Sequence, residues 1–432
     1  MLDRRLVQRA AGFGQAVAPS APVTPRERAE NAVRWAAVLL GCSIPVSVAL
    51  DNALLGLILL FWIAGGGYRD KLAAVRGNPV AWLALALLAL FGAGSLYSGG
   101  TSKDVVDGLT KALRLLLIPA LIFLLRDPVW RERGIAAFLA SMLVTLVLSY
   151  LFWLGLLAPN GWLKGTQLDP VAFKAHITHN VFMAFTAFLL AQAAVDAPTR
   201  RGRITFALLC AAAVANVLLM VPGRTGIIVL LVLFTYFLCR RFGAKGFATA
   251  GVALAALVVV VLASPDSMLH RRIALADEEF VQWRAGVPPD RTSSVGLRLE
   301  LLRNTLEIIR RNPVLGVGTG GFGNAYADLV GAKGASEQNP HNEILLMVAQ
   351  FGVAGFVLLG GLFVTQWRLA VRLPGRLEPA AARALVLTIA VASVLSSTLV
   401  DHTEGLFFAY MSGLLFAGYS AGAARAATGP AR

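Results

Sequence analysis

The strongest constraint on this chain is a succession of long, almost uninterrupted apolar runs. About twelve of them reach or approach the ~20 residues that cross a bilayer as a helix. Hydrocarbon offers no partners to backbone N–H and C=O groups, so only helices and closed barrels span a membrane. A barrel needs alternating apolar and polar residues, which these runs do not show. With 57% hydrophobic and 15% charged residues, the chain is predicted to be an all-α polytopic membrane protein.

The predicted spans are bounded by charged or turn-forming residues. They lie near 33–50, 53–67, 79–97, 113–125, 134–158, 177–195, 203–221, 225–240, 246–263, 342–367, 381–400 and 405–423. The predicted division of the chain is a tail at 1–32, transmembrane helices 1–9 at 33–263, a large loop at 264–340, transmembrane helices 10–12 at 341–424 and a tail at 425–432. The first two spans are expected to join tightly at Asp51 and Asn52.

The placement of basic residues predicts the orientation in the membrane. Alternate loops carry Arg69, Lys71, Arg76, Arg126, Arg131, Arg133, Arg200, Arg201, Arg203, Arg240, Arg241, Lys245, Arg368, Arg372, Arg376 and Arg383. Because cytoplasmic loops hold the excess of Lys and Arg, both termini are predicted to be cytoplasmic. This bias also accounts for the net charge of +15, without a nucleic-acid partner. Cys42, Cys210 and Cys239 lie in apolar runs and are interpreted as small hydrophobic residues.

The large loop at 264–340 falls on the non-cytoplasmic side and carries charges of both signs. Long polar loops between short ones are usually functional. Within it, Ser294 is expected to cap a helix over 295–311, which Pro313 ends. An apolar stripe is predicted along this helix, made of Val295, Leu299, Leu302, Leu306 and Ile309. Such a helix would lie on the membrane surface or roof a cavity between spans.

His341 stands where the polar loop meets the next apolar run. Asn339 is expected to cap the following helix and Pro340 to occupy its first position, which places His341 in the first turn. An imidazole there could act as a general base near neutral pH, because its ordinary pKa is about 6.5. The alternative is an interfacial histidine without chemistry. Glu343 could orient His341 or repel cations.

Other polar residues cluster at the same predicted membrane face. Arg224 is the basic residue of a tight outer turn, against the prevailing charge bias, and its planar guanidinium suits a phosphate. The alternative is a snorkelling anchor. Asp401, His402 and Glu404 occupy another outer turn, either as a solvated turn or as support for the same site.

Two further motifs have simpler interpretations. The glycine-rich segment 316–323 resembles a nucleotide-binding loop, but no βαβ context surrounds it, so a tight turn leading toward His341 is favoured. His176 and His179 stand at the start of a span without an evident third metal ligand. Structural polar contacts are the favoured role for both, and lining of the site is the alternative.

Three motifs together resemble those of the O-antigen ligase and O-antigen polymerase superfamily. They are Pro222-Gly223-Arg224-Thr225-Gly226 at the start of a central span, Arg298 followed after three residues by Leu302, and His341-Asn342 followed after nine residues by Gly352-Val353-Ala354-Gly355. They extend over roughly 220–360 on one predicted membrane face. The number of spans is similar to that of the superfamily.

The resemblance implies a glycosyltransferase of the bacterial inner membrane. Its donor would be O-antigen on undecaprenyl diphosphate, and its acceptor a hydroxyl of lipid A–core oligosaccharide at the periplasmic face. His341 would be the catalytic base, and the predicted substrate-binding residues are Arg224, Arg298, Asn342, Arg303 and His402. Two arginines can replace the metal that many sugar transferases use, so neither a metal nor a cofactor is expected. A single displacement would invert the anomeric centre.

Related activities remain as alternatives. An O-antigen polymerase extends the glycan, and a protein O-oligosaccharyltransferase moves it to serine or threonine. The histidine-glycine motif favours a ligase over a polymerase, and a chain ending close to its last span disfavours the protein glycosyltransferase. A transporter of lipid-linked sugars is the alternative outside the superfamily. It is expected to show repeated halves and mid-membrane charges, whereas here the charges cluster in an outer loop.

Overall fold

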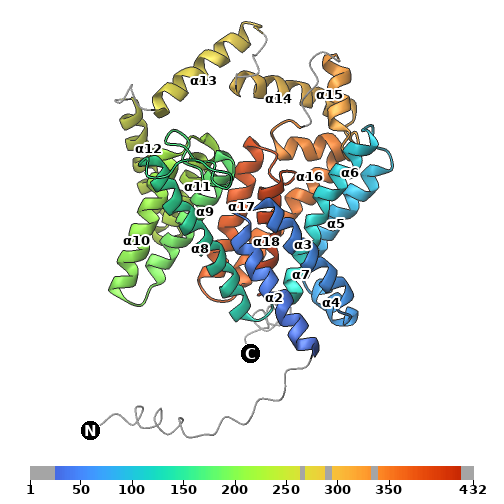
Figure 1. Ribbon diagram of the computed structural model, residues 1–432. Coiled ribbons are helices and arrows are strands. Elements are labelled where there is room, and N and C mark those ends of the chain that lie inside the picture. The colour runs from blue at the N-terminus through green and yellow to red at the C-terminus, as the bar shows by residue number, and fades with distance from the viewer. Residues whose placement is uncertain (1–24, 263–267, 288–293, 332–338, 420–432) are drawn as a thin grey trace, which may run out of the picture.

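The computed structural model describes residues 25–262, 268–287, 294–331 and 339–419. Regular structure in these ranges is entirely helical, which confirms the predicted all-α class. Most helices form a bundle, and three short helices stand above one end of it (Figure 1). The predicted C-terminal tail at 425–432 and residues 1–24 of the N-terminal tail lie outside the described residues.

Each predicted span contains a helix. The bundle consists of α2 (Pro25–Ser43), α3 (Val48–Ala64), α5 (Pro79–Ser95), α7 (Leu117–Leu124), α8 (Pro128–Trp153), α9 (His176–Asp196), α10 (Arg200–Ala215), α11 (Arg224–Phe242), α12 (Ala244–Leu262), α16 (Glu343–Leu369), α17 (Leu377–Leu395) and α18 (His402–Phe416). Short helices connect or cover them: α4 (Tyr68–Arg76), α6 (Ser102–Ala112), η2 (Leu113–Leu116), η3 (Asn216–Met220), η4 (Ala370–Arg372), α13 (Met268–Arg284), α14 (Ser294–Arg311) and α15 (Phe322–Val330).

Length and apolar composition distinguish the strongest membrane spans. Within the described ranges, 6 helices are long and apolar enough to cross a membrane, or up to 7 if the bent pair α3–α4 counts as one span. The remaining bundle helices are shorter or less apolar, so the total of twelve crossings stays a prediction. The aromatic core lies between α8, α9 and α18, where Phe138, Phe182 and Phe407 contact one another at centroid distances of 4.4 to 6.2 Å.

Capping residues set several helix boundaries. Asn78 accepts from the N–H of Val80 (3.1 Å), with Pro79 at the first position of α5. A capping residue also shows that the turn expected at Asp51 and Asn52, between the first two spans, was placed wrongly. The turn lies between α2 and α3, where Ser47 caps α3, and Asp51 therefore falls inside the first turn of α3. Buried there, Asp51 pairs with Lys174 of the α8–α9 loop (3.3 Å).

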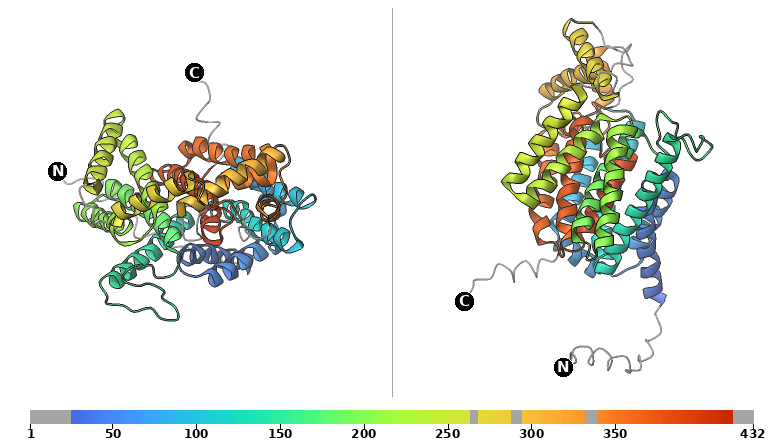
Figure 2. Two further views of the ribbon diagram at one scale, coloured as in Figure 1. Left: turned by 90° about the horizontal axis from the view of Figure 1, so that it is seen from above. Right: turned by 90° about the vertical axis from the view of Figure 1, so that its left-hand side faces the viewer.

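The loops with clustered basic residues meet at one end of the bundle. Arg131 pairs with Glu378 (2.9 Å), and Arg240 donates to the carbonyl of Arg376 (3.4 Å). Arg376 in turn approaches Asp196 (3.9 Å). Loops distant in sequence thus share one end, opposite the end covered by α13, α14 and α15 (Figure 2). The assignment of the basic end to the cytoplasm stays a prediction.

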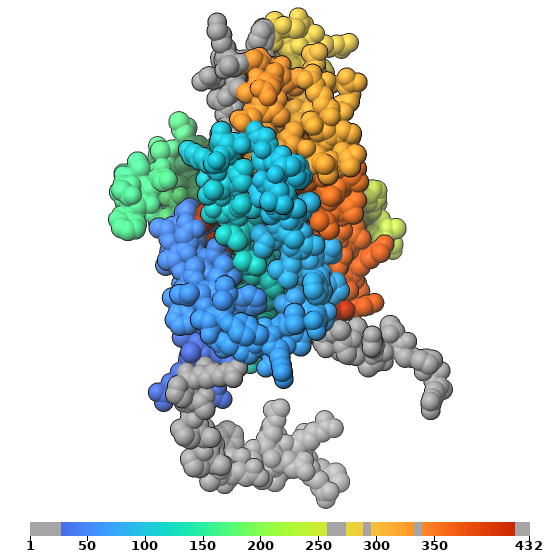
Figure 3. All heavy atoms as spheres, turned by 90° about the vertical axis from the view of Figure 1, so that its right-hand side faces the viewer, coloured from blue at the N-terminus to red at the C-terminus, as the bar shows by residue number. Residues whose placement is uncertain are grey.

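A layer made of α14, α15 and the first part of α16 covers the other end. Figure 3 shows α15, in orange, above α5 and α6, in cyan. The helix predicted over 295–311 is confirmed as α14, and only part of the predicted apolar stripe contacts the protein, since Ile309 packs against the buried cluster of Leu301 and Ile308. Leu301, Thr305 and Ile308 are buried, while Leu302 and Leu306 are 39% and 51% exposed. The helix carries apolar side chains on two faces. The face with Leu301 and Ile308 is the one that packs against α15 and α16.

The glycine-rich segment docks into a break in α16. Gly352 has φ 59° and ψ −145°, so the helix is interrupted and nearby carbonyls lose their helical partners. The N–H groups of Val317 and Gly318 bond to the carbonyls of Ala349 (2.8 Å) and Gln350 (2.9 Å). The glycine-rich loop therefore has a structural role. It holds in place the first part of α16, which directly follows His341.

Candidate active site

His341 lies before α16, not in its first turn, which corrects the expected position. Asn342 is the capping residue, and its Oδ1 accepts the N–H of Leu345 (2.9 Å). His341 has φ 50°, a left-handed conformation that few residues other than glycine adopt, most often asparagine, aspartate and histidine. Asn339, the residue expected to cap α16, lies three residues before the actual cap and bonds to His341 and Ser397 instead. The imidazole is half-buried.

Three polar side chains hold this strained segment. Asn339 Oδ1 accepts the N–H of His341 (3.0 Å) and the hydroxyl of Ser397 (3.0 Å). Asn342 Nδ2 donates to the carbonyl of Val394 (3.0 Å). These bonds tie the segment from both sides to the end of α17, so the backbone of His341 is fixed before any substrate arrives. Both polar atoms of the Asn342 side chain have partners within the protein, and its predicted role in substrate binding stays a prediction.

Glu343 ties α16 to the loop between α17 and α18. Its buried carboxylate accepts the N–H groups of Leu399 (2.9 Å) and Val400 (3.3 Å). It also lines a cavity of about 20 Å³ with Lys111 and Arg114. Of the two roles open for Glu343, the geometry favours positioning, because the loop it holds carries Asp401.

Asp401 is an acidic residue that interacts electrostatically with His341. Loss of hydration raises the pKa of its carboxyl above the ordinary value, while the positive charges of Lys111, His341 and Arg114 oppose that shift. Arg114 also donates to the backbone carbonyl of Asp401 (2.9 Å). A carboxylate therefore lies within electrostatic range of the imidazole.

Arg224 and Arg298 come together at the outer end of α11. Burial lowers the pKa of the Arg298 guanidinium, and the nearby charge of Arg224 lowers it further. Both side chains are half-buried. Within the described residues, Arg298 makes no ion pair with an acidic side chain. Two positive charges that lie close together at half-buried positions attract an anion. Planar guanidinium groups suit phosphate oxygens.

Two glycines bring Arg224 to this position. A Cβ on Gly226 would overlap the backbone of Asn180 in α9, and one on Gly223 would meet the Asn180 side chain. Asn180 in turn donates to the carbonyl of Val221 (3.2 Å). The absence of side chains therefore allows α11 to begin directly against α9, which sets the direction in which Arg224 leaves the helix.

Two predicted substrate-binding residues lie apart from the arginine pair. Arg303 is exposed on the outward face of α14, where it lines a groove with Leu302 and Leu306. His402 Nε2 donates to Asn52 Oδ1 (2.7 Å), so this imidazole is directed toward α3. Neither contact tests a role in substrate binding, which stays a prediction for both residues.

The two histidines at the start of α9, His176 and His179, lie in different environments. His176 is exposed, whereas His179 is buried and donates to Asn216 Oδ1 (2.8 Å). In the part of the chain that the structure describes, no three His, Cys, Asp or Glu side chains form a group that could hold a metal. Sequence reasoning missed Arg114, although an arginine inside a predicted span is costly and signals a functional or structural partner.

Comparison with known proteins bears on the stretch that holds these residues. A family model described as O-antigen ligase matches residues 206–360. The matched stretch includes Arg224, Arg298, His341 and the helix break at Gly352. No curated protein matches the chain. The chain is thus a multi-pass helical membrane protein whose residues 206–360 are similar to the O-antigen ligase family.

Proposed function

We propose that this protein is an O-antigen ligase. It transfers a glycan from undecaprenyl diphosphate to a hydroxyl of lipid A–core oligosaccharide, at the periplasmic face of the bacterial inner membrane. The observation that carries this proposal is the match of residues 206–360 to the O-antigen ligase family model, and the electrostatic proximity of Arg224 and Arg298 supports it. A half-buried pair of like charges fits a diphosphate better than a neutral sugar.

The arginine pair would act on the leaving group. As the bond between the anomeric carbon and the diphosphate breaks, negative charge grows on the phosphate oxygen. Fixed guanidinium groups stabilise that charge without having to reorganise during the step. Diphosphate is already a good leaving group, so the proposal needs no separate general acid. The same charges take the place that a divalent metal occupies in many sugar transferases.

His341 would act on the nucleophile. It removes the proton from the acceptor hydroxyl as the oxygen attacks the anomeric carbon, and the diphosphate leaves from the opposite side with the bonding electrons. One glycosidic bond forms, one carbon–oxygen bond breaks, and the proton remains on the imidazole. Asp401, within electrostatic range, stabilises that charged imidazole. A single displacement inverts the anomeric configuration.

Reconstitution tests the proposed reaction. Purified protein in vesicles that contain lipid-linked glycan and lipid A–core is expected to yield glycan on lipid A–core, with inverted configuration and with turnover unchanged by a chelator. Product analysis by mass spectrometry separates this outcome from the polymerase alternative, in which the glycan lengthens on the polyprenyl carrier. Activity lost to the chelator and restored by a divalent ion would refute the metal-free proposal.

Arg298→Lys is expected to lower turnover by about 10- to 100-fold, although the charge is kept. Lysine presents a point charge and loses the planar, two-pronged grip on phosphate oxygens. Arg310→Lys is the matched control on the same helix, because the Arg310 side chain is 80% exposed and pairs only with Glu307 among the described residues. Equal activity of the two variants would reduce the role of Arg298 to simple charge attraction.

A further inference from the structure

A buried chain of hydrogen bonds joins α8, α9 and the π-helix η3, just before the turn that leads to Arg224. Asn216 Nδ2 donates to the Ser149 hydroxyl (2.8 Å), and His179 Nε2 donates to Asn216 Oδ1 (2.8 Å). All three side chains belong to residues that are at most 3% exposed. Both polar atoms of the Asn216 side chain therefore have partners inside the bundle. The proposed transfer reaction uses none of these groups directly.

These bonds hold η3, which runs from Asn216 to Met220. The π-helix is closed by the N–H of Val221, which donates to the carbonyl of Asn216 (3.1 Å). A π turn contains one residue more than an α-helical turn and is rare. A return to α-helical hydrogen bonds would rotate the chain that follows by about 100°. The direction in which Arg224 leaves the start of α11 therefore depends on η3.

Two consecutive residues of α9 hold the two ends of η3. His179 bonds to Asn216 at its start, and Asn180 Nδ2 donates to the carbonyl of Val221 just after its end (3.2 Å). Asn180 is fully buried, and its side chain also lies against Gly223, the residue before α11. One turn of α9 thereby fixes both the start of the π turn and the entry into α11. Loss of either bond leaves a buried polar group without its partner, a cost that a change of the backbone would relieve.

We propose that the hydrogen bonds that hold η3 position Arg224 on the leaving diphosphate. The positioning residues are His179, Asn180 and Asn216. The inference rests on the proposed function and adds the groups that set the direction of one of its two arginines. Arg298 comes from α14, a different segment, so its guanidinium does not depend on η3.

Removal of the His179 donor tests the proposal by binding. His179→Met keeps a side chain of similar length and is expected to raise the dissociation constant of a polyprenyl diphosphate without glycan at least about tenfold. The reason is that a displaced arginine loses a charge-assisted hydrogen bond to phosphate. His179→Gln should restore most of the affinity, because its amide nitrogen can donate to Asn216 as Nε2 does. Titration of the full-length protein in detergent measures the affinities, and equal values for the two variants would overturn the proposal.

Gln366→Met is the matched control for a general loss of stability. Gln366 Nε2 donates to the Ser412 hydroxyl (2.7 Å), another bond between fully buried side chains, close to the end of α16 at Leu369 and far along the chain from η3. This variant should lower the thermal midpoint about as much as His179→Met does and leave the affinity for the diphosphate unchanged. An equal loss of affinity in Gln366→Met would show an effect of destabilisation alone and overturn the proposal.

A double-mutant cycle shows whether His179 acts through Arg224. His179→Met should weaken binding at least about tenfold in the wild-type protein, but by less than about twofold when Arg224→Ala is already present. Beside Arg298→Ala the tenfold loss should persist, because Arg224 is still there to be displaced. Equal losses in the wild-type and Arg224→Ala backgrounds would show a role independent of Arg224 and overturn the inference.

The binding experiments separate this inference from the proposed function. Coupling between His179 and Arg224 in a protein that transfers no glycan would leave the inference intact while refuting the ligase proposal. Glycan transfer by a protein without this coupling would overturn the inference alone. A wild-type protein that does not bind the polyprenyl diphosphate would overturn both.

Discussion

His341→Asn is expected to lower glycan transfer by about 10² to 10⁴-fold, the usual contribution of a general base. Asparagine is chosen because it tolerates the left-handed backbone of His341 (φ 50°), whereas alanine there would add strain of about 1–2 kcal/mol. The amide cannot take up a proton near neutral pH. Single-turnover transfer from lipid-linked glycan to lipid A–core, measured with saturating donor, reports the loss.

Two controls separate the chemistry of His341 from its backbone. His341→Gly removes both the base and the strain, so it should be as inactive as the asparagine variant while unfolding no earlier on heating. Crosslinking of a photoreactive polyprenyl diphosphate to the protein should remain in both variants, because the arginine pair is untouched. Normal ligation in His341→Asn would exclude the base role.

Gly352→Ala is expected to destabilise the outer half of α16 by about 3 kcal/mol or more. The residue has φ 59° and ψ −145°, a region open essentially to glycine, and an added Cβ would overlap the carbonyl of Val314. The glycine-rich segment must then withdraw, and its bonds to Ala349 and Gln350 break. A large fall in thermal midpoint should accompany loss of transfer.

Gly360→Ala is the matched control for Gly352. It lies in the same helix, has no atom near the added Cβ and keeps helical geometry, so alanine should be neutral or slightly stabilising. Proteolysis of the segment around 316–323 gives a local readout, since an undocked loop becomes accessible. Equal thermal midpoints for the two variants would contradict the docking role of the break.

Much of the framework could be predicted because it depends on local patterns. Long apolar runs predicted the helices, whereas the predicted start of α16 at Asn339 and Pro340 was wrong by three residues. The grouping of Arg224, Arg298 and His341 in one site came from motifs that resemble those of a known superfamily, and it stays a prediction. The nine residues between Asn342 and Gly352 now have a structural meaning. They form about two and a half helical turns between the capping residue and the helix break.

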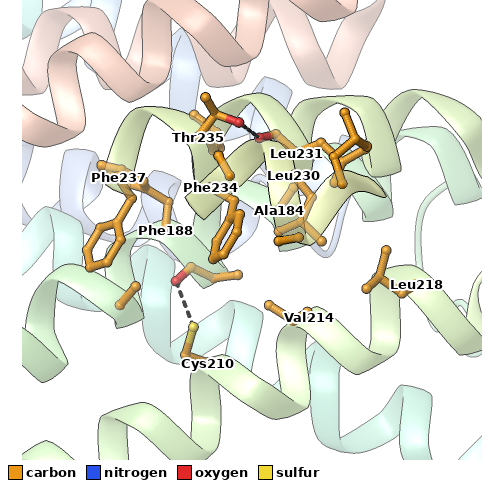
Figure 4. A pocket seen from close by; sticks show the side chains of 16 residues that line it. Ala184, Phe188, Cys210, Val214, Leu218, Leu230, Leu231, Phe234, Thr235 and Phe237 are labelled. Carbon is orange, nitrogen blue, oxygen red and sulfur yellow. Dashed lines mark hydrogen bonds between the residues drawn. The ribbon is translucent and has the colours of Figure 1, made fainter. Parts of the chain in front are cut away.

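The remainder depended on contacts between distant segments. Asn342, and not the expected Asn339, caps α16 and bonds to the end of α17, which leaves His341 outside the helix in a left-handed conformation. α14 is apolar on two faces, and only its packing against α15 and α16 shows which one is buried. The apolar cavity of about 480 Å³ between α9, α10, α11 and α12 (Figure 4) likewise depends on how these four helices pack. Local free-energy preferences are encoded residue by residue, but a choice between nearly equal local options is made by packing and hydrogen bonds across the fold.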